Sequence, residues 1–152
     1  MSQLPKVAVI GTGGTITSIS VVGPLDLYEY TATGKMMEAD QLVAKFPEVH
    51  QVADIIPIRF KAVPSTAVAF PEWKQVVIEA DKAVASIPDL AGIVVLHGTA
   101  TLEETAYALN LTAKVKVPIV VVGSQRPASA LSTDAGLNLV NAVKGAMEFE
   151  RG

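Results

Sequence analysis

Cysteine is absent from the 152-residue sequence, and histidine occurs only twice. The lack of cysteine excludes disulfides and thiolate metal sites. The two histidines, His50 and His97, lie in unrelated segments and do not have the spacing of a metal-ligand motif. We therefore expect neither a metal nor another cofactor.

Basic residues and long apolar runs are also scarce. Twelve Lys and Arg against fifteen Asp and Glu give a formal net charge of −3, without the basic stripe of a nucleic-acid-binding protein. Half of the residues are hydrophobic, yet runs such as 118–122 are far shorter than the roughly 20 residues that span a bilayer. The N-terminus lacks the hydrophobic region and cleavage site of a signal peptide. We expect a cytoplasmic protein that binds neither nucleic acid nor a membrane.

Short apolar runs alternate with helical patterns along the chain, which has the length of one domain. The runs predict strands at residues 6–10, 52–60, 93–96 and 119–122. Between and after them, the patterns predict helices at residues 38–46, at 71–86, from 101 onward and at 134–148. This alternation predicts an α/β domain with a doubly wound, mostly parallel sheet flanked by helices. Pro57 favours an edge position or a bend for the second strand.

Two polar residues are placed to cap helices. Thr101 is followed three residues later by Glu104, which is the spacing of a capping box. Asp134 precedes the last helical pattern and is placed to cap it. Glu103 and Glu104 are successive helix residues that do not face each other, so we assign neither to catalysis.

Two threonines follow glycine turns at the ends of buried strands. The first turn, residues 11–15, ends at Thr15, and the second, residues 97–101, contains Thr99. Two parallel strands bring both turns to the same carboxyl edge of the sheet, where α/β folds build their sites. Thr15 is therefore placed as a nucleophile, which would need a base nearby, or as a hydrogen-bonding group. From this turn alone, a helix N-cap is the simpler interpretation.

The first glycine turn also resembles the start of a dinucleotide-binding fingerprint. The third glycine of G-x-G-x-x-G would fall at Ile16, however, and no lysine follows to form a P-loop. A dinucleotide-binding domain is therefore the weakest of the interpretations. Glycines still let the backbone turn sharply and direct its amides at an anion or a carbonyl oxygen.

Further polar candidates lie in a loop and at other strand ends. The long segment 17–35 carries Tyr28 and Tyr30, either of which can fold back over Thr15 as part of a lid. His97 could act as a base, but we favour a role in holding its turn through hydrogen bonds. Residues 65–66, Ser and Thr, could hold a carboxylate or simply form a turn.

Together these segments resemble the bacterial L-asparaginase family. Residues 12–16, TGGTI, resemble its first signature, and residues 97–106, HGTATLEETA, resemble its second, usually written H-G-T-D-T-x-E-E-T-A. The similarity continues through residues 122–127 and 134–142, so it covers essentially the whole chain. It implies that residues 1–152 form an asparaginase-type N-terminal domain. It also implies a hydrolase that converts L-asparagine to L-aspartate and ammonia through a threonine nucleophile, with weak glutaminase activity.

The resemblance implies a role for each matching residue. Thr15 is the nucleophile, Tyr30 rather than Tyr28 is the lid tyrosine that activates it, and Thr99 is the second catalytic threonine. Ser65 binds the substrate α-carboxylate. The other residues implied in substrate binding are Gly14, Thr66, Gly98, Ala100 and Ser124.

The sequence departs from the family's pattern in two respects. Ala100 stands where the family has an aspartate that supports proton transfer and pairs with the substrate ammonium group. The family's catalytic lysine and its smaller C-terminal domain, which completes the neighbouring subunit's site in a homotetramer, would lie beyond Gly152. We therefore expect a naturally short or a shortened asparaginase that forms a homo-oligomer through exposed apolar surface. The alternative is a catalytically disabled domain of the same fold that binds asparagine or aspartate.

Overall fold

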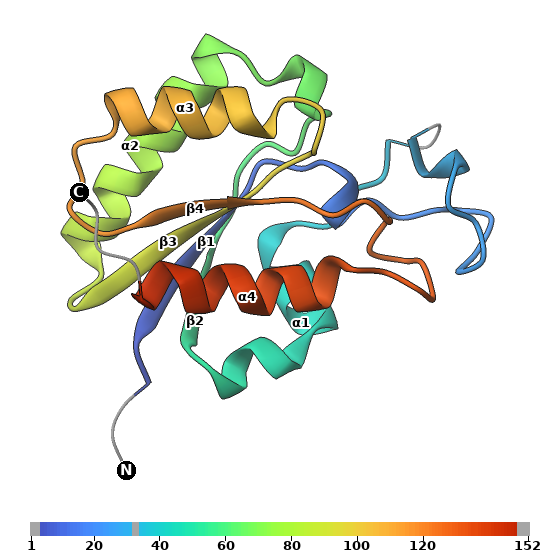
Figure 1. The fold of residues 1–152 in the computed structure, drawn as a ribbon, viewed down its shortest axis with the longest axis horizontal. Coiled ribbons are helices and arrows are strands. Elements are labelled where there is room, and N and C mark those ends of the chain that lie inside the picture. Colours follow the sequence, from blue (N-terminus) through green and yellow to red (C-terminus); the bar gives the residue numbers. More distant parts are fainter. Residues whose placement is uncertain (1–3, 32–33, 149–152) are drawn as a thin grey trace.

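A computed structural model describes residues 4–31 and 34–148, and the chain end at 149–152 lies outside the described residues. Its sheet has the strand order β2-β1-β3-β4, with every pair parallel. The strands are β1 (Lys6–Gly11), β2 (Asp54–Ile58), β3 (Leu90–Leu96) and β4 (Ile119–Val122). Helices cover both faces (Figure 1), with α2 (Phe70–Ser86) and α3 (Leu102–Thr112) on one and α1 (Ala39–Lys45) and α4 (Ala135–Glu148) on the other. The predicted fold class is confirmed.

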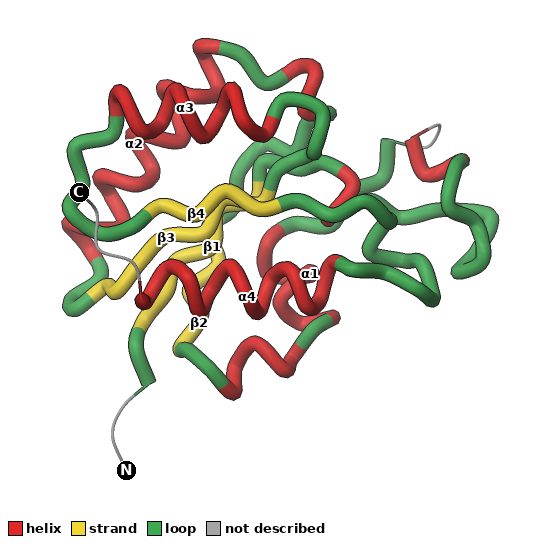
Figure 2. Tube along the Cα trace, in the orientation of Figure 1, coloured by secondary structure: helices red, strands yellow, loops and turns green. Residues whose placement is uncertain are grey.

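The central strands are apolar along their whole length because both faces of the sheet are covered. Successive side chains of a strand point to opposite faces. In β1, Val7 and Val9 belong to the core cluster beneath α1 and α4, whereas Ala8 and Ile10 belong to the cluster beneath α2. The strand β3 divides between the two clusters in the same way. The tube in Figure 2 shows how these strands run directly into the loops at one end of the sheet.

The strand β2 is shorter than predicted and forms one edge of the sheet. The first two residues of the expected strand, Val52 and Ala53, instead form the short connection that follows a 3₁₀ helix at Pro47–Gln51. Pro57 pairs in register with Val9 of β1. An edge strand tolerates a residue without an N–H group because one of its sides has no partner strand. The edge position predicted from Pro57 is therefore confirmed.

The capping box predicted at the start of α3 is wrong. Thr101 does precede the helix, but its side chain makes no capping hydrogen bond. Its hydroxyl donates instead to the carbonyl oxygen of Ser65 at 2.7 Å. The Ser65 carbonyl has thus replaced the first-turn amide that a capping box would have offered to Thr101. The bond connects the turn after β3 to the turn after β2.

Asp134 directly precedes α4 and joins that helix to the loop after β4. Its carboxylate accepts hydrogen bonds from the backbone amides of Gln125 and Arg126 at 3.0 and 2.9 Å. Burial of Asp134 raises its pKa, but these amides, together with the side chain of Asn138, outweigh burial and leave the pKa below its ordinary value. The carboxylate therefore holds the loop as well as the helix start.

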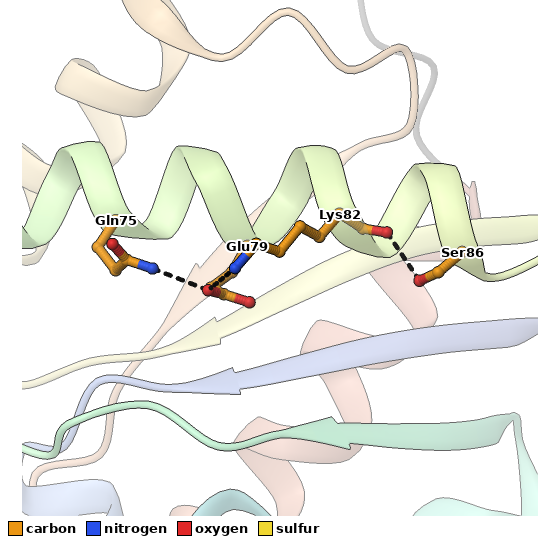
Figure 3. A network of polar contacts seen from close by, with 4 residues as sticks. All are labelled: Gln75, Glu79, Lys82 and Ser86. Atoms are coloured by element: carbon orange, nitrogen blue, oxygen red, sulfur yellow. Dashed lines mark hydrogen bonds and ion pairs between the residues drawn. The ribbon is translucent and has the colours of Figure 1, made fainter.

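The exposed face of α2 carries a local network of polar contacts (Figure 3). Glu79 accepts hydrogen bonds from Gln75 at 2.8 Å and from Lys82 at 2.9 Å, and the hydroxyl of Ser86 donates to the carbonyl of Lys82. The bond from Lys82 is the main reason that the pKa of Glu79 lies below its ordinary value. Pairs of this spacing stabilise a helix by roughly 0.2–0.5 kcal/mol each.

A core substitution tests this packing. We expect Ile93→Ala to lower the free energy of unfolding by about 2–5 kcal/mol, because Ile93 is fully buried and its truncation leaves a cavity under α2. Leu137→Ala removes the same kind of side chain from a position that is 69% exposed, and we expect it to cost under about 0.5 kcal/mol. Urea denaturation measures both, and similar losses in the two variants would contradict the burial described.

Candidate active site

Three turns at the carboxyl edge of the sheet pack so closely that a side chain on either of two glycines would overlap a neighbouring turn. Gly14, in the turn after β1, has a φ of 87°, a conformation that favours glycine. A Cβ added to Gly14 would lie 2.2 Å from the amide nitrogen of Gly98, in the turn after β3. A Cβ on Gly98 would in turn lie 2.7 Å from the hydroxyl oxygen of Ser65, in the turn after β2. The two glycine turns therefore share one edge, as predicted.

A cavity of about 320 Å³ opens where these turns meet, which is large enough for a small metabolite. Its wall contains eight of the nine residues predicted for the site: Gly14, Thr15, Tyr30, Ser65, Thr66, Gly98, Thr99 and Ala100. The remaining lining residues, which sequence reasoning did not single out, are Ser18, Thr31, Gly34, Met36 and Pro64. Most of these follow Thr15 or Tyr30 closely along the chain. Their nearness to those two residues is the one sequence feature that could have predicted them as lining residues.

Thr15 begins a three-residue 3₁₀ helix, Thr15–Thr17, and does not cap it, because Gly14 occupies the N-cap position. The helix-cap interpretation of Thr15 is therefore wrong. Its hydroxyl oxygen lies 3.3 Å from the phenolic oxygen of Tyr30. This distance is long for a bond between hydroxyls, and such catalytic contacts commonly shorten when a substrate binds.

The peptide between Gly14 and Thr15 is held firmly. The carbonyl oxygen of Gly14 accepts hydrogen bonds from the hydroxyls of Thr17 and Ser18 at 3.0 and 2.9 Å, and from the amide of Thr17 at 3.0 Å.

The three-residue helix at Thr15–Thr17 is too short to offer the helix N-terminus on which a dinucleotide pyrophosphate rests. Its length argues against the dinucleotide-binding interpretation.

Asp26 organises the segment that carries Tyr30. Its carboxylate accepts hydrogen bonds from the hydroxyl of Ser20 and from the backbone amides of Tyr28 and Glu29. The Ser20 hydroxyl is the main cause, and the two amides the next, of an Asp26 pKa below its ordinary value. The turn thus formed leads directly into the 3₁₀ helix Glu29–Thr31, which contains Tyr30.

The two tyrosines of this segment differ in position. Tyr28 is 83% exposed, whereas Tyr30 is half-buried, lines the cavity and faces the Thr15 hydroxyl. This geometry favours Tyr30 over Tyr28 as the partner of Thr15.

His97 lies fully buried beneath the turn after β3. Its Nδ1 atom is 2.8 Å from the carbonyl oxygen of Gly98, and its Nε2 atom is 2.8 Å from the hydroxyl oxygen of Thr105. Burial lowers the pKa of His97, and it outweighs the opposing effects of the Gly98 carbonyl and the Glu104 charge. The bonds to both sides of the ring confirm that His97 holds its turn.

Ser124 is the one predicted site residue that does not line the cavity. It is buried, and its hydroxyl donates to the carbonyl of Arg126 at 2.7 Å. The neighbouring Gly123 packs against Thr99, which is a residue of the cavity wall. A Cβ added to Gly123 would lie 3.0 Å from the Cγ2 methyl of Thr99. The main-chain contact predicted for Ser124 stays a prediction.

The described side chains that line the cavity include hydroxyl groups but no charged groups. Among the described residues that line it, none carries a carboxylate, an ammonium or a guanidinium group, and Ala100 contributes only a methyl. Within residues 4–31 and 34–148, no group of His, Cys, Asp and Glu side chains comes together to hold a metal ion. In the same part of the chain, no helix is both long and apolar enough to cross a membrane.

The parallel sheet and the cavity at its carboxyl edge define an α/β domain of the kind that holds a ligand at that edge. Comparison with known families makes this specific. Residues 6–152 match the family model described as Asparaginase, N-terminal, and the chain belongs to the asparaginase family.

Individual relatives agree with this assignment. The chain is 37% identical over 145 residues to a glutaminase-asparaginase of Pseudomonas fluorescens biotype A, covering 93% of this chain and 38% of the relative. It is also 37% identical over 145 residues to a glutamyl-tRNA(Gln) amidotransferase component of Thermococcus kodakarensis, covering 95% of this chain and 31% of the relative. The chain therefore spans well under half the length of these relatives.

A solved structure shows the same fold. The crystal structure of a probable cytoplasmic L-asparaginase from Campylobacter jejuni superposes with a TM-score of 0.84 at 34% identity. The match covers 97% of this chain and 44% of that chain.

His97 gives the stability of the protein a pH dependence. Its folded-state pKa lies below the ordinary value of about 6.5, so below that pH the unfolded chain binds a proton that folded His97 does not. The contribution to the free energy of unfolding is therefore full above about pH 6.5. It falls below that pH by up to about 1.4 kcal/mol per pH unit, until the folded-state pKa is reached.

Urea denaturation between about pH 7 and pH 5 measures this slope. We expect His97→Gln to remove it, whereas His50→Gln, at an exposed position, should keep it. Equal slopes in the two variants would contradict the assignment. If His97→Gln does not fold, an NMR titration of the His97 ring in the unaltered protein gives the folded-state pKa directly.

Proposed function

We propose that this domain hydrolyses the side-chain amide of L-asparagine to L-aspartate and ammonia, with Thr15 as the nucleophile and with weaker activity on glutamine. The observation that carries the proposal is the Thr15–Tyr30 hydroxyl pair in a cavity that Ser65 and Thr99 also line. Membership of the asparaginase family supports the amide as the bond attacked.

The first chemical step forms an ester and releases ammonia. The hydroxyl oxygen of Thr15 attacks the amide carbon, and its proton passes to the phenolic oxygen of Tyr30 as Tyr30 gives its own proton to the departing nitrogen. The carbon–nitrogen bond then breaks. Tyr30 is neutral before and after the step, so it serves as a relay in a site without a charged base.

The second step consumes one water molecule. Water attacks the ester carbon, the bond to Thr15 breaks, and the threonine hydroxyl recovers its proton as aspartate leaves. The sum of the two steps is an amide plus water giving a carboxylate and ammonium. We assign the handling of these protons to Thr99, the second threonine of the cavity wall.

Substrate binding depends on the turns that form the cavity. Ser65, with Thr66 beside it, binds the α-carboxylate of the substrate through its hydroxyl. Backbone amides in the turns of Gly14 and Gly98 donate to the developing oxyanion, for which one good donor contributes roughly 3–4 kcal/mol. Self-association of the chain stays a prediction.

A second candidate function rests on Ala100. This residue lines the cavity with a methyl, where the resemblance places an aspartate that pairs with the substrate ammonium. Losing a buried charged partner of this kind costs roughly 2–5 kcal/mol. The alternative is therefore a domain that binds asparagine or aspartate without turning it over. The relative from Thermococcus kodakarensis is named as part of a glutamyl-tRNA(Gln) amidotransferase, so similar chains are not all named for asparagine.

Replacement of Thr15 tests the nucleophile. We expect Thr15→Ala to abolish ammonia release from asparagine, because no ester can form, and Thr15→Ser to retain part of it, because the hydroxyl remains. A coupled ammonia assay measures both variants beside the unaltered chain. Activity that survives in Thr15→Ala would show that another group attacks. If the unaltered chain is inactive and calorimetry detects bound asparagine, the second function is the correct one.

Restoring a carboxylate tests the role of position 100. We expect Ala100→Asp to raise kcat/KM for asparagine, or affinity where turnover is absent, by at least about thirtyfold, which corresponds to the low end, about 2 kcal/mol, of the range for a buried charge pair. Ala100→Asn has nearly the same shape without the charge and should give little of this gain. Equal effects of the two substitutions would mean that the ammonium group of the substrate is not bound here.

A further inference from the structure

A chain of three hydrogen bonds leads from the helix layer to the cavity wall. The indole Nε1–H of Trp73, on α2, donates to the hydroxyl oxygen of Thr105, on α3, at 2.8 Å. That hydroxyl is 2.8 Å from Nε2 of His97, and Nδ1 of His97 is 2.8 Å from the carbonyl oxygen of Gly98. Gly98 lines the cavity, whereas Thr105 and His97 are fully buried.

The chemistry of the two end groups fixes the direction of every bond in this chain. An indole N–H can only donate, and a carbonyl oxygen can only accept. Nδ1 of His97 must therefore carry the proton that is donated to Gly98. The hydroxyl of Thr105 accepts from Trp73 and donates to Nε2, which is unprotonated in a neutral ring. In the other neutral tautomer, Nδ1 and the Gly98 carbonyl would face each other as two acceptors.

The last bond of the chain sets the orientation of one peptide group. In a trans peptide the N–H of Thr99 points to the side opposite the carbonyl of Gly98. With the carbonyl of Gly98 held against the buried His97 ring, the N–H of Thr99 points away from that ring, and both Gly98 and Thr99 line the cavity. A glycine backbone rotates freely without such a restraint.

We propose that Trp73 and Thr105 are positioning residues for the site, which act through the tautomer of His97 to present the Thr99 amide to the substrate. This inference rests on the proposed function for its catalytic consequence. Neither residue lines the cavity, and both lie on helices, Trp73 on α2 and Thr105 on α3. Their contribution is orientation of a backbone donor, so its loss should affect turnover more than ground-state binding.

The test compares two substitutions of Thr105 that differ in the hydroxyl. Thr105→Val keeps the shape and removes the hydroxyl, whereas Thr105→Ser keeps the hydroxyl. We expect Thr105→Val to lower kcat for asparagine at least tenfold with KM changed less than threefold, and Thr105→Ser to stay within threefold of the unaltered chain. Trp73→Phe, which removes only the first donor, should give a smaller loss of kcat. A kcat that is the same in the Val and Ser variants would overturn the proposal.

A second readout does not depend on hydrolysis. Nitrogen-15 NMR of the His97 ring in the unaltered chain should show the proton on Nδ1, and a proton on Nε2 would overturn the proposal. Thr105→Val should shift the Thr99 amide resonance and Thr105→Ser should not. If the unaltered chain releases no ammonia, the proposed function fails while these resonances still decide the positioning role. A Thr99 resonance unmoved in both variants would contradict it.

Discussion

The close approach of three backbone turns is the constraint on which the site depends. Gly14 and Gly98 come so near each other that a side chain on either would collide with the other turn or with Ser65. Parallel strands bring the turns to one edge, but only glycine lets them close to this distance. The cavity is therefore bounded by peptide groups whose orientation the fold fixes. Thr15 and Thr99 belong to these turns, so the fold also fixes the backbone positions that carry their hydroxyls.

The site combines rigid amides with an absence of charge. Its described lining contains threonine, serine and tyrosine hydroxyls but no carboxylate or ammonium group. Such a wall can hold a substrate and stabilise an oxyanion through its amides. Activation of the Thr15 hydroxyl in the proposed mechanism depends on Tyr30, whose phenolic oxygen lies 3.3 Å from it. We expect residue 100 to decide between turnover and simple binding, whereas the proposed role of the buried chain through His97 concerns only the orientation of a backbone amide.

Apolar runs predicted the strands well, because a strand buried on both faces has to be apolar throughout. Pro57 identified the edge strand for an equally local reason, its missing N–H group. The capping box at Thr101 failed because the Ser65 carbonyl, far away in the sequence, competes for the same hydroxyl. Three members of the hydrogen-bond chain from Trp73 to Gly98 lie within the second signature, but nothing in the sequence pointed to the bond from Trp73, because that residue comes from a separate helix.

The sequence by itself determined the α/β class and the two glycine turns, because these follow from apolar periodicity and glycine positions, and its resemblance to the asparaginase signatures supplied eight residues of the cavity wall. Only the tertiary structure decided that Thr101 donates to Ser65 instead of capping α3, that Trp73 donates to Thr105, and that the hydroxyl of Tyr30 lies 3.3 Å from that of Thr15. Each of those outcomes depends on which groups from distant segments meet at about 3 Å. Local sequence preferences do not contain that information.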